Sequence, residues 1–109
     1  MDNKTNISQL KEKVKTFVAE RNWQEFHSPK NLASSIAIEA AEIMEHFQWL
    51  TIEESRNVIK DSAKHDEVSM ELADVIIYCL SFANVCDIDI SDAVIKKLTI
   101  NESRFPKTD

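Results

Sequence analysis

The sequence predicts an all-α, single-domain protein in which four main helices form a bundle and one shorter helix is added. The chain contains no glycine and two prolines, so it lacks the residue on which tight hairpin turns and phosphate-binding loops depend. Apolar residues recur every three or four positions along most of it, the spacing of amphipathic helices. Its 109 residues suit one domain, expected over residues 1–109.

The first helix is predicted over residues 7–21, with Asn6 or Ser8 available as its N-cap. The second is predicted over residues 30–48, because Pro29 disfavours helix before it and suits a first helical position. The apolar stripe of this second helix consists of Leu32, Ala33, Ile36, Ala40, Ile43 and Phe47.

Two further helices follow in the middle of the chain. Thr51 and Glu54 have the spacing of a capping box, which predicts a short helix ending near Ile59. A long helix is predicted over residues 63–85. Because this helix is apolar almost all round over residues 75–83, we expect it to be central or to lie in an oligomer interface.

The last helix is predicted over residues 92–103, after a turn at residues 87–91. Cys79 and Cys86 are seven residues apart on the long helix, about 10 Å, which is too far for a disulfide between them. We therefore expect reduced cysteines in a cytoplasmic protein. The polar N-terminus lacks the apolar region of a signal peptide, and no uninterrupted apolar run approaches the length of a membrane span, so no membrane association is expected.

The charge balance of the chain argues against binding to nucleic acid. The formal net charge is −6 and the isoelectric point is about 5.0. DNA and RNA backbones attract basic surfaces, so we expect no nucleic-acid partner.

Four carboxylates form the most informative pattern in the sequence. Glu39 and Glu42 are three residues apart on the second predicted helix, and Glu71 and Asp74 are three residues apart on the long one. On a helical wheel Glu39 lies about 20° from Leu32, so the acids border an apolar stripe instead of facing away from it. Two such helices packed together would concentrate negative charge that a hard divalent cation can offset.

Oxygen ligands favour Mg²⁺, with Mn²⁺ as a possible substitute, over zinc. A di-iron bundle is disfavoured because it needs a glutamate three residues before a histidine on two helices, and none of the three histidines has one. The alternative interpretation is a solvated acidic face on a non-catalytic helical interaction protein.

With the two acid pairs, two other segments carry a resemblance to a known family. Residues 22–32 read Asn-Trp-x-x-Phe-His-x-Pro-Lys-Asn-Leu, and residues 97–106 read Lys-x-x-x-Asn-x-x-Arg-Phe-Pro. Together with the pairs Glu-x-x-Glu and Glu-x-x-Asp, these segments resemble the MazG-like all-α nucleoside triphosphate pyrophosphohydrolases, and in particular their dCTP pyrophosphatase branch.

The resemblance implies hydrolysis of a (deoxy)nucleoside triphosphate, dCTP or a related substrate, to the monophosphate and pyrophosphate. It implies homodimers or homotetramers with shared sites; a relative acting on dUTP or phosphoribosyl-ATP is an alternative. By position, the metal ligands would be Glu39, Glu42, Glu71 and Asp74, and we expect Glu42 to lie nearest the attacking water. The implied substrate-binding residues are Trp23, His27, Lys30, Asn31, Trp49, Tyr78, Lys97, Asn101 and Arg104.

Overall fold

The computed structural model describes residues 1–108, which contain helices and no strands. The elements in chain order are α1 (Ile7–Glu20), a 3₁₀ turn η1 (Gln24–Phe26), α2 (Pro29–Glu45), α3 (Ile52–Val58), α4 (Ser62–Cys86) and α5 (Ile90–Arg104). The prediction of an all-α chain with four main helices and one short helix is confirmed.

Local capping explains where the first two long helices begin. Asn6 caps α1, because its side chain accepts a hydrogen bond from the Gln9 amide at 2.9 Å while the Gln9 side chain accepts one from the Asn6 amide at 2.8 Å. Ser28 caps α2, and its hydroxyl accepts a hydrogen bond from the Asn31 amide at 3.1 Å. Of the two predicted N-cap candidates of the first helix, Asn6 and Ser8, Asn6 is therefore the N-cap.

Removal of the Ser28 hydroxyl is expected to destabilise the fold by about 1 kcal/mol, because an amide at the start of α2 then loses its acceptor. Chemical denaturation of Ser28→Ala would measure the change. The control is Ser34→Ala on the same helix, where the hydroxyl donates only to the Lys30 carbonyl at 3.4 Å. Equal stabilities for the two variants would contradict a capping role.

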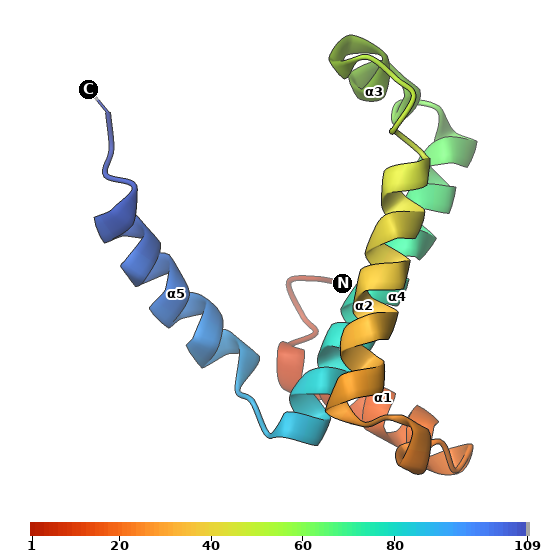
Figure 1. Ribbon diagram of the computed structural model, residues 1–109, viewed down its shortest axis with the longest axis vertical. Helices are drawn as coiled ribbons and strands as arrows, with labels where there is room; N and C mark the ends of the chain where they lie inside the picture. Colours follow the sequence, from red (N-terminus) through yellow and green to blue (C-terminus); the bar gives the residue numbers. More distant parts are fainter. Residues whose placement is uncertain (109) are drawn as a thin grey trace.

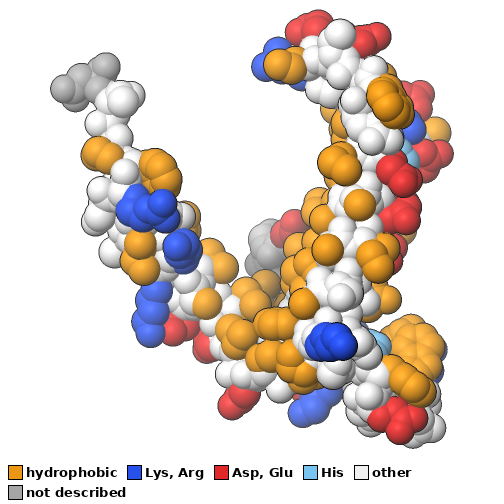
Figure 2. All heavy atoms as spheres, in the orientation of Figure 1, with side chains coloured by type: hydrophobic (Ala, Val, Ile, Leu, Met, Phe, Trp, Pro, Cys, Tyr) orange, Lys and Arg blue, Asp and Glu red, His pale blue; other side chains and the backbone are white. Residues whose placement is uncertain are grey.

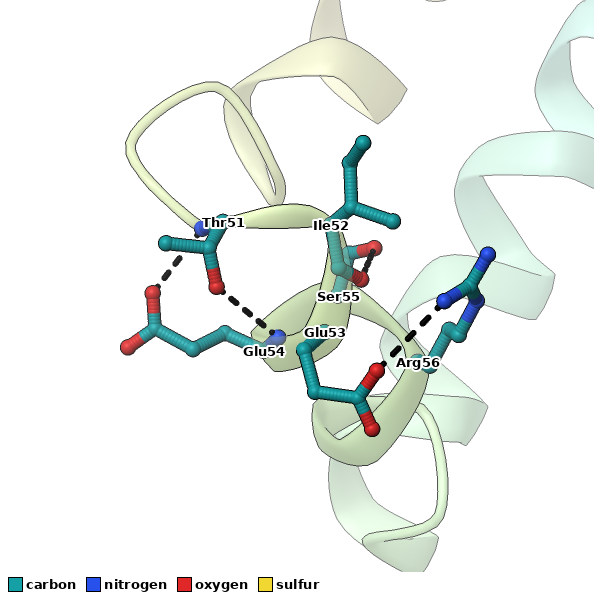
Figure 3. A network of polar contacts seen from close by, with 6 residues as sticks. All are labelled: Thr51, Ile52, Glu53, Glu54, Ser55 and Arg56. Atoms are coloured by element: carbon teal, nitrogen blue, oxygen red, sulfur yellow. Dashed lines mark hydrogen bonds and ion pairs between the residues drawn. The ribbon is translucent and has the colours of Figure 1, made fainter.

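The short helix α3 begins with the predicted capping box (Figure 3). The Thr51 amide donates to the Glu54 carboxylate at 2.8 Å, and the Glu54 amide donates to the Thr51 hydroxyl at 3.1 Å. The Thr51 amide, and after it the Thr51 hydroxyl, stabilise the charged carboxylate and lower the pKa of Glu54 below its ordinary value. An ion pair between Arg56 and Glu53 at 3.4 Å lies on the same exposed surface.

The long helix α4 is central, with α2 packed along it and α1 packed against its C-terminal half (Figure 1). The fully buried apolar residues are Leu32 of α2 and Leu80 and Ala83 of α4. Two polar contacts join α1 to the end of α4 and the turn after it: the side-chain amide of Asn84 donates to the Lys11 carbonyl at 3.0 Å, and the Lys11 ammonium donates to the Ile88 carbonyl at 2.9 Å.

By length and composition alone, α4 could cross a membrane, and it is one such helix within residues 1–108. No membrane association was expected from the sequence, because no uninterrupted apolar run is long enough to span a membrane. Glu71 and Asp74 interrupt α4, but the average composition of the helix is apolar. A mostly buried core helix passes the same test; α4 packs against both α1 and α2, and 17% of its apolar window is buried within the single chain.

The sequence predicted that the four main helices form a bundle, but within one chain they do not close into one. Asp87 ends α4 in a left-handed conformation (φ 55°), and α5 then runs away from the α2–α4 pair (Figure 1). Figure 2 shows hydrophobic side chains exposed both on α5 and on the α2–α4 pair. Those on α5 are Val94, Ile95, Leu98 and Ile100.

Two predicted boundaries were wrong by a few residues. Helix α5 begins at Ile90 instead of Asp92, because Asp89 accepts a hydrogen bond from the Asp92 amide at 2.9 Å and acts as the N-cap. Helix α2 ends at Glu45 instead of Gln48. Beyond that point the backbone tightens, and His46 donates its amide to the Ile43 carbonyl three residues earlier.

Candidate metal centre and adjoining pocket

Three of the four predicted metal ligands meet where α2 and α4 lie side by side. Glu39 of α2 and Glu71 and Asp74 of α4 each offer one oxygen, and these oxygens all lie within 4.8 Å of one another. We call these three residues the carboxylate cluster. Glu71 and Asp74 face the same way because three residues make almost one helical turn.

The fourth predicted ligand, Glu42, is close to this cluster without being part of it. It is half-buried one turn after Glu39 on α2, and its oxygens lie outside the group that meets within 4.8 Å. Its charge nevertheless acts on Glu39. Glu42 therefore lies beside the three residues that meet, and the structure does not place it among them.

Burial and the neighbouring carboxylates both disfavour the ionised form of Glu39, the residue that α2 contributes to the carboxylate cluster. Desolvation is the largest cause of a raised pKa at Glu39, followed by the negative charges of Asp74, Glu42 and Glu71. A cation among these oxygens would reverse the repulsion, since an opposite charge favours the ionised carboxylates.

The donor set fits a hard divalent cation. All three groups offer carboxylate oxygen, the ligand that Mg²⁺, Mn²⁺ and Ca²⁺ prefer. Because the three oxygens already lie within 4.8 Å of one another, rotation of the side chains would allow them to hold one ion together.

An apolar pocket of about 360 Å³ adjoins the cluster between α1, α4 and the segment before α2. We call it the aromatic pocket. Asp74 belongs to both its wall and the carboxylate cluster, so a molecule in the pocket would lie beside any bound cation. The pocket is lined by Lys13, Val14, Phe17, Val18, Trp23, His27, Asp74, Ile77, Tyr78 and Ser81.

Four rings follow one another along this wall. The ring centroids of Phe17 and Trp23 are 5.7 Å apart, those of Trp23 and His27 are 6.3 Å apart, and those of His27 and Tyr78 are 6.4 Å apart. The Nδ1 atom of His27 is buried without a hydrogen-bond partner. A flat ligand could stack against these rings.

Trp23, His27 and Tyr78 of the predicted substrate-binding residues therefore lie together. Lys30 and Asn31 are exposed at the start of α2 outside the pocket lining, and the side-chain amide of Asn31 donates to the Phe26 carbonyl at 3.0 Å. The other predicted residues lie outside the pocket lining as well. They are Trp49, which is 87% exposed after α2, and Lys97, Asn101 and Arg104 on α5.

His46 was not among the predicted site residues, but it lies beside the carboxylate cluster. Its side chain is 17% exposed, and its Nε2 atom lies 3.9 Å from a carboxylate oxygen of Glu71. A signal was available, because His46 follows Glu39 by seven residues and so lies about 20° from it on a helical wheel. The pocket residues Lys13 and Ser81 were also missed, and nothing in their local pattern distinguishes them.

Comparison with known proteins gives consistent matches. A profile of the MazG-like family matches residues 34–109. Over 90 residues, which are 83% of this chain, it is 38% identical to human (Homo sapiens) dCTP pyrophosphatase 1 and 37% identical to the protein of that name from Mus musculus. The chain spans about half (53%) of the length of these curated relatives.

The fold also matches a crystal structure of a pyrophosphatase from Archaeoglobus fulgidus, with a TM-score of 0.86 and 40% sequence identity. That match covers 92% of each chain. The protein is thus homologous to pyrophosphatases over most of its length, and an acidic cluster able to hold a metal is typical of their family. The chain belongs to the MazG-like family.

Proposed function

We propose that this protein is a Mg²⁺-dependent hydrolase that converts a deoxynucleoside triphosphate, dCTP first, to the monophosphate and pyrophosphate. One observation carries the proposal: Asp74 is shared by the carboxylate cluster and the aromatic pocket. A base in the pocket would thereby extend its phosphates towards the metal centre. The names of the homologous pyrophosphatases support the same reaction class.

Each group has a distinct task in this proposal. Trp23 and Tyr78 enclose the base and sugar, and the His27 ring lies between them in the wall of the pocket. Glu39, Glu71 and Asp74 hold the cation, which when bound supplies positive charge against the triphosphate. Glu42, close to the cluster but outside it, orients a water and takes its proton as the water attacks the α-phosphorus.

The experiment that tests this is hydrolysis of single dNTPs and NTPs with Mg²⁺ in ¹⁸O-labelled water. Monophosphate that carries the label, with unlabelled pyrophosphate, would show attack at the α-phosphorus; loss of turnover in Glu42→Ala would support its role as the base. Comparing the rates ranks the bases. Diphosphate and phosphate as products would refute the mechanism, and no turnover of any nucleotide would favour the interaction-protein interpretation.

Removal of the Trp23 ring is expected to weaken substrate binding more than turnover. Stacking of one base on an aromatic side chain is worth about 1–3 kcal/mol, and it is made before and during the reaction alike. We therefore expect Trp23→Ala to raise KM about tenfold or more while kcat changes little. Steady-state kinetics would check this, with Phe26→Ala as the control because Phe26 is exposed outside the pocket.

We further propose that copies of the chain associate through the exposed apolar residues of α4 and α5, as a homodimer or homotetramer. Leu98 on α5 is 56% exposed in the single chain. Association would bring Lys97, Asn101 and Arg104 close to another copy, where they could reach substrate phosphates. Light scattering is expected to show a smaller particle for Leu98→Glu and an unchanged one for Ser103→Glu; an unchanged particle for both would argue against this interface.

A further inference from the structure

His46, the residue that ends α2, bridges two charged groups of α4. Its Nδ1 atom lies 3.2 Å from the Lys64 ammonium, and its Nε2 atom lies 3.9 Å from Oε1 of Glu71. All three side chains are largely shielded from water, with exposed fractions of 17% for His46, 27% for Glu71 and 29% for Lys64. The bridge joins the two helices that carry the carboxylate cluster.

The contact with Lys64 determines which nitrogen of His46 carries the hydrogen. An ammonium group can only donate hydrogen bonds, so Nδ1 must accept one at 3.2 Å. A neutral imidazole whose Nδ1 accepts carries its hydrogen on Nε2. That N–H is then the group that lies nearest the carboxylate of Glu71.

Lys64 is itself held in place. It lies in the first turn of α4, where its backbone amide donates to the Asp61 carboxylate at 3.0 Å. Its ammonium also forms an ion pair with Glu67 at 3.5 Å. The cap therefore fixes the backbone of Lys64, and the ion pair restrains its ammonium group.

We propose that His46, kept in the Nε2–H tautomer by Lys64, is a positioning residue that orients Glu71 in the metal centre. This inference rests on the proposed metal site. The present 3.9 Å contact is longer than a hydrogen bond, and rotation of the side chains that closes about 1 Å would make it one. An N–H held against one oxygen restricts the rotation of the carboxylate, and the positive charge of Lys64 behind the ring offsets part of the repulsion in the cluster.

Mn²⁺ titration of the metal-free protein, followed by electron paramagnetic resonance, tests the inference without turnover. His46→Asn places its amide near the position of Nδ1 and leaves Glu71 without a donor, so we expect Mn²⁺ affinity to fall about tenfold. His46→Gln reaches the position of Nε2 and is expected to recover much of that loss. The matched control is His65→Asn, since His65 is an exposed histidine of α4, and its affinity should equal that of the wild type.

A second measurement reads the tautomer directly. Long-range ¹H–¹⁵N correlation spectra of the metal-free wild type are expected to show the Nε2–H pattern at His46. In Lys64→Met the ammonium is lost at similar side-chain length, and the spectrum is expected to shift towards a mixture of tautomers. Thermal melts of every variant would show that these proteins are folded.

The outcomes separate this inference from the proposed function. If the wild type binds Mn²⁺ and His46→Asn binds it equally well, His46 does not position Glu71, and the proposed function stands. An equal loss in His46→Gln and His46→Asn, or an Nδ1–H pattern in the wild type, would also overturn the positioning role alone. If the wild type binds neither Mn²⁺ nor Mg²⁺, the inference and the proposed metal site fall together.

Discussion

Asp74→Asn is expected to reduce Mg²⁺-dependent nucleotide hydrolysis about a thousandfold. Asp74 is shared by the carboxylate cluster and the aromatic pocket, so the change removes a negative ligand at the point where cation and substrate would meet. A metal ion contributes several kcal/mol of charge stabilisation in such reactions, and about 4 kcal/mol is a thousandfold in rate. The measurement is kcat/KM for dCTP at saturating Mg²⁺, together with the Mg²⁺ affinity from calorimetry.

The control for this prediction is Asp66→Asn, because Asp66 is an exposed acid of the same helix outside the cluster. It removes the same charge from α4, so hydrolysis and Mg²⁺ affinity should stay close to wild type. Circular dichroism would show that both variants are folded. If Asp74→Asn retained activity and Mg²⁺ affinity, the carboxylates would be an ordinary solvated face, as an interaction protein requires.

Glu39→Gln is expected to raise the melting temperature of the metal-free protein by about 2–4 °C. Relief of a like-charge contact is worth about 0.5 kcal/mol, and about 1 kcal/mol shifts a domain of this size by 4–8 °C. If Mg²⁺ binds at the proposed metal centre it should stabilise the wild type, because a ligand of the folded state favours folding, and Glu39→Gln should gain little from added Mg²⁺.

The pH dependence of this effect has a definite sign. The pKa of Glu39 is raised above its ordinary value of 4.5 in the folded protein, first by burial and then by Asp74, Glu42 and Glu71. The folded state therefore binds the proton more tightly than the unfolded chain does, and metal-free stability should fall as the pH rises from about 4.5 through the folded pKa. In Glu39→Gln this part of the dependence should be absent.

Glu45→Gln is the control for Glu39→Gln, since Glu45 is an exposed acid on the same helix. Its melting temperature should respond to pH and Mg²⁺ as that of the wild type does. A lower metal-free melting temperature in Glu39→Gln would contradict the inference that the carboxylates of the cluster repel one another and destabilise the metal-free fold.

The parts of the structure that follow from short segments could be predicted from the sequence. The caps at Asn6, Ser28 and Thr51 depend on groups within three residues of one another, so local chemistry decides them. The pairing of Glu71 with Asp74 likewise follows from helical geometry. Packing of α2 on α4 then had to bring the two acid pairs together, because each pair borders the apolar stripe that the helices bury against each other.

The direction of α5 and the contacts of His46 could not be predicted in the same way. The course of α5 depends on one left-handed residue, Asp87, and aspartate takes that conformation in some contexts and not in others. His46 contacts Lys64 and Glu71, which are far from it in sequence and approach only because α3 and its turns return the chain to α4. Helical periodicity predicts the side of α2 on which His46 lies, but it does not predict which residues of α4 the side chain contacts.

The small number of buried apolar side chains has a consequence for how the stability of the folded protein depends on its concentration. Among residues 1–108, Leu32, Leu80 and Ala83 are the fully buried apolar residues, so a lone chain removes little apolar surface from water and gains little free energy by doing so. Where association covers the remaining surface, folding obeys the law of mass action and depends on protein concentration. Dilution alone should then lower the melting temperature, and in a cell the rate of synthesis would help to decide what fraction of the chains is folded.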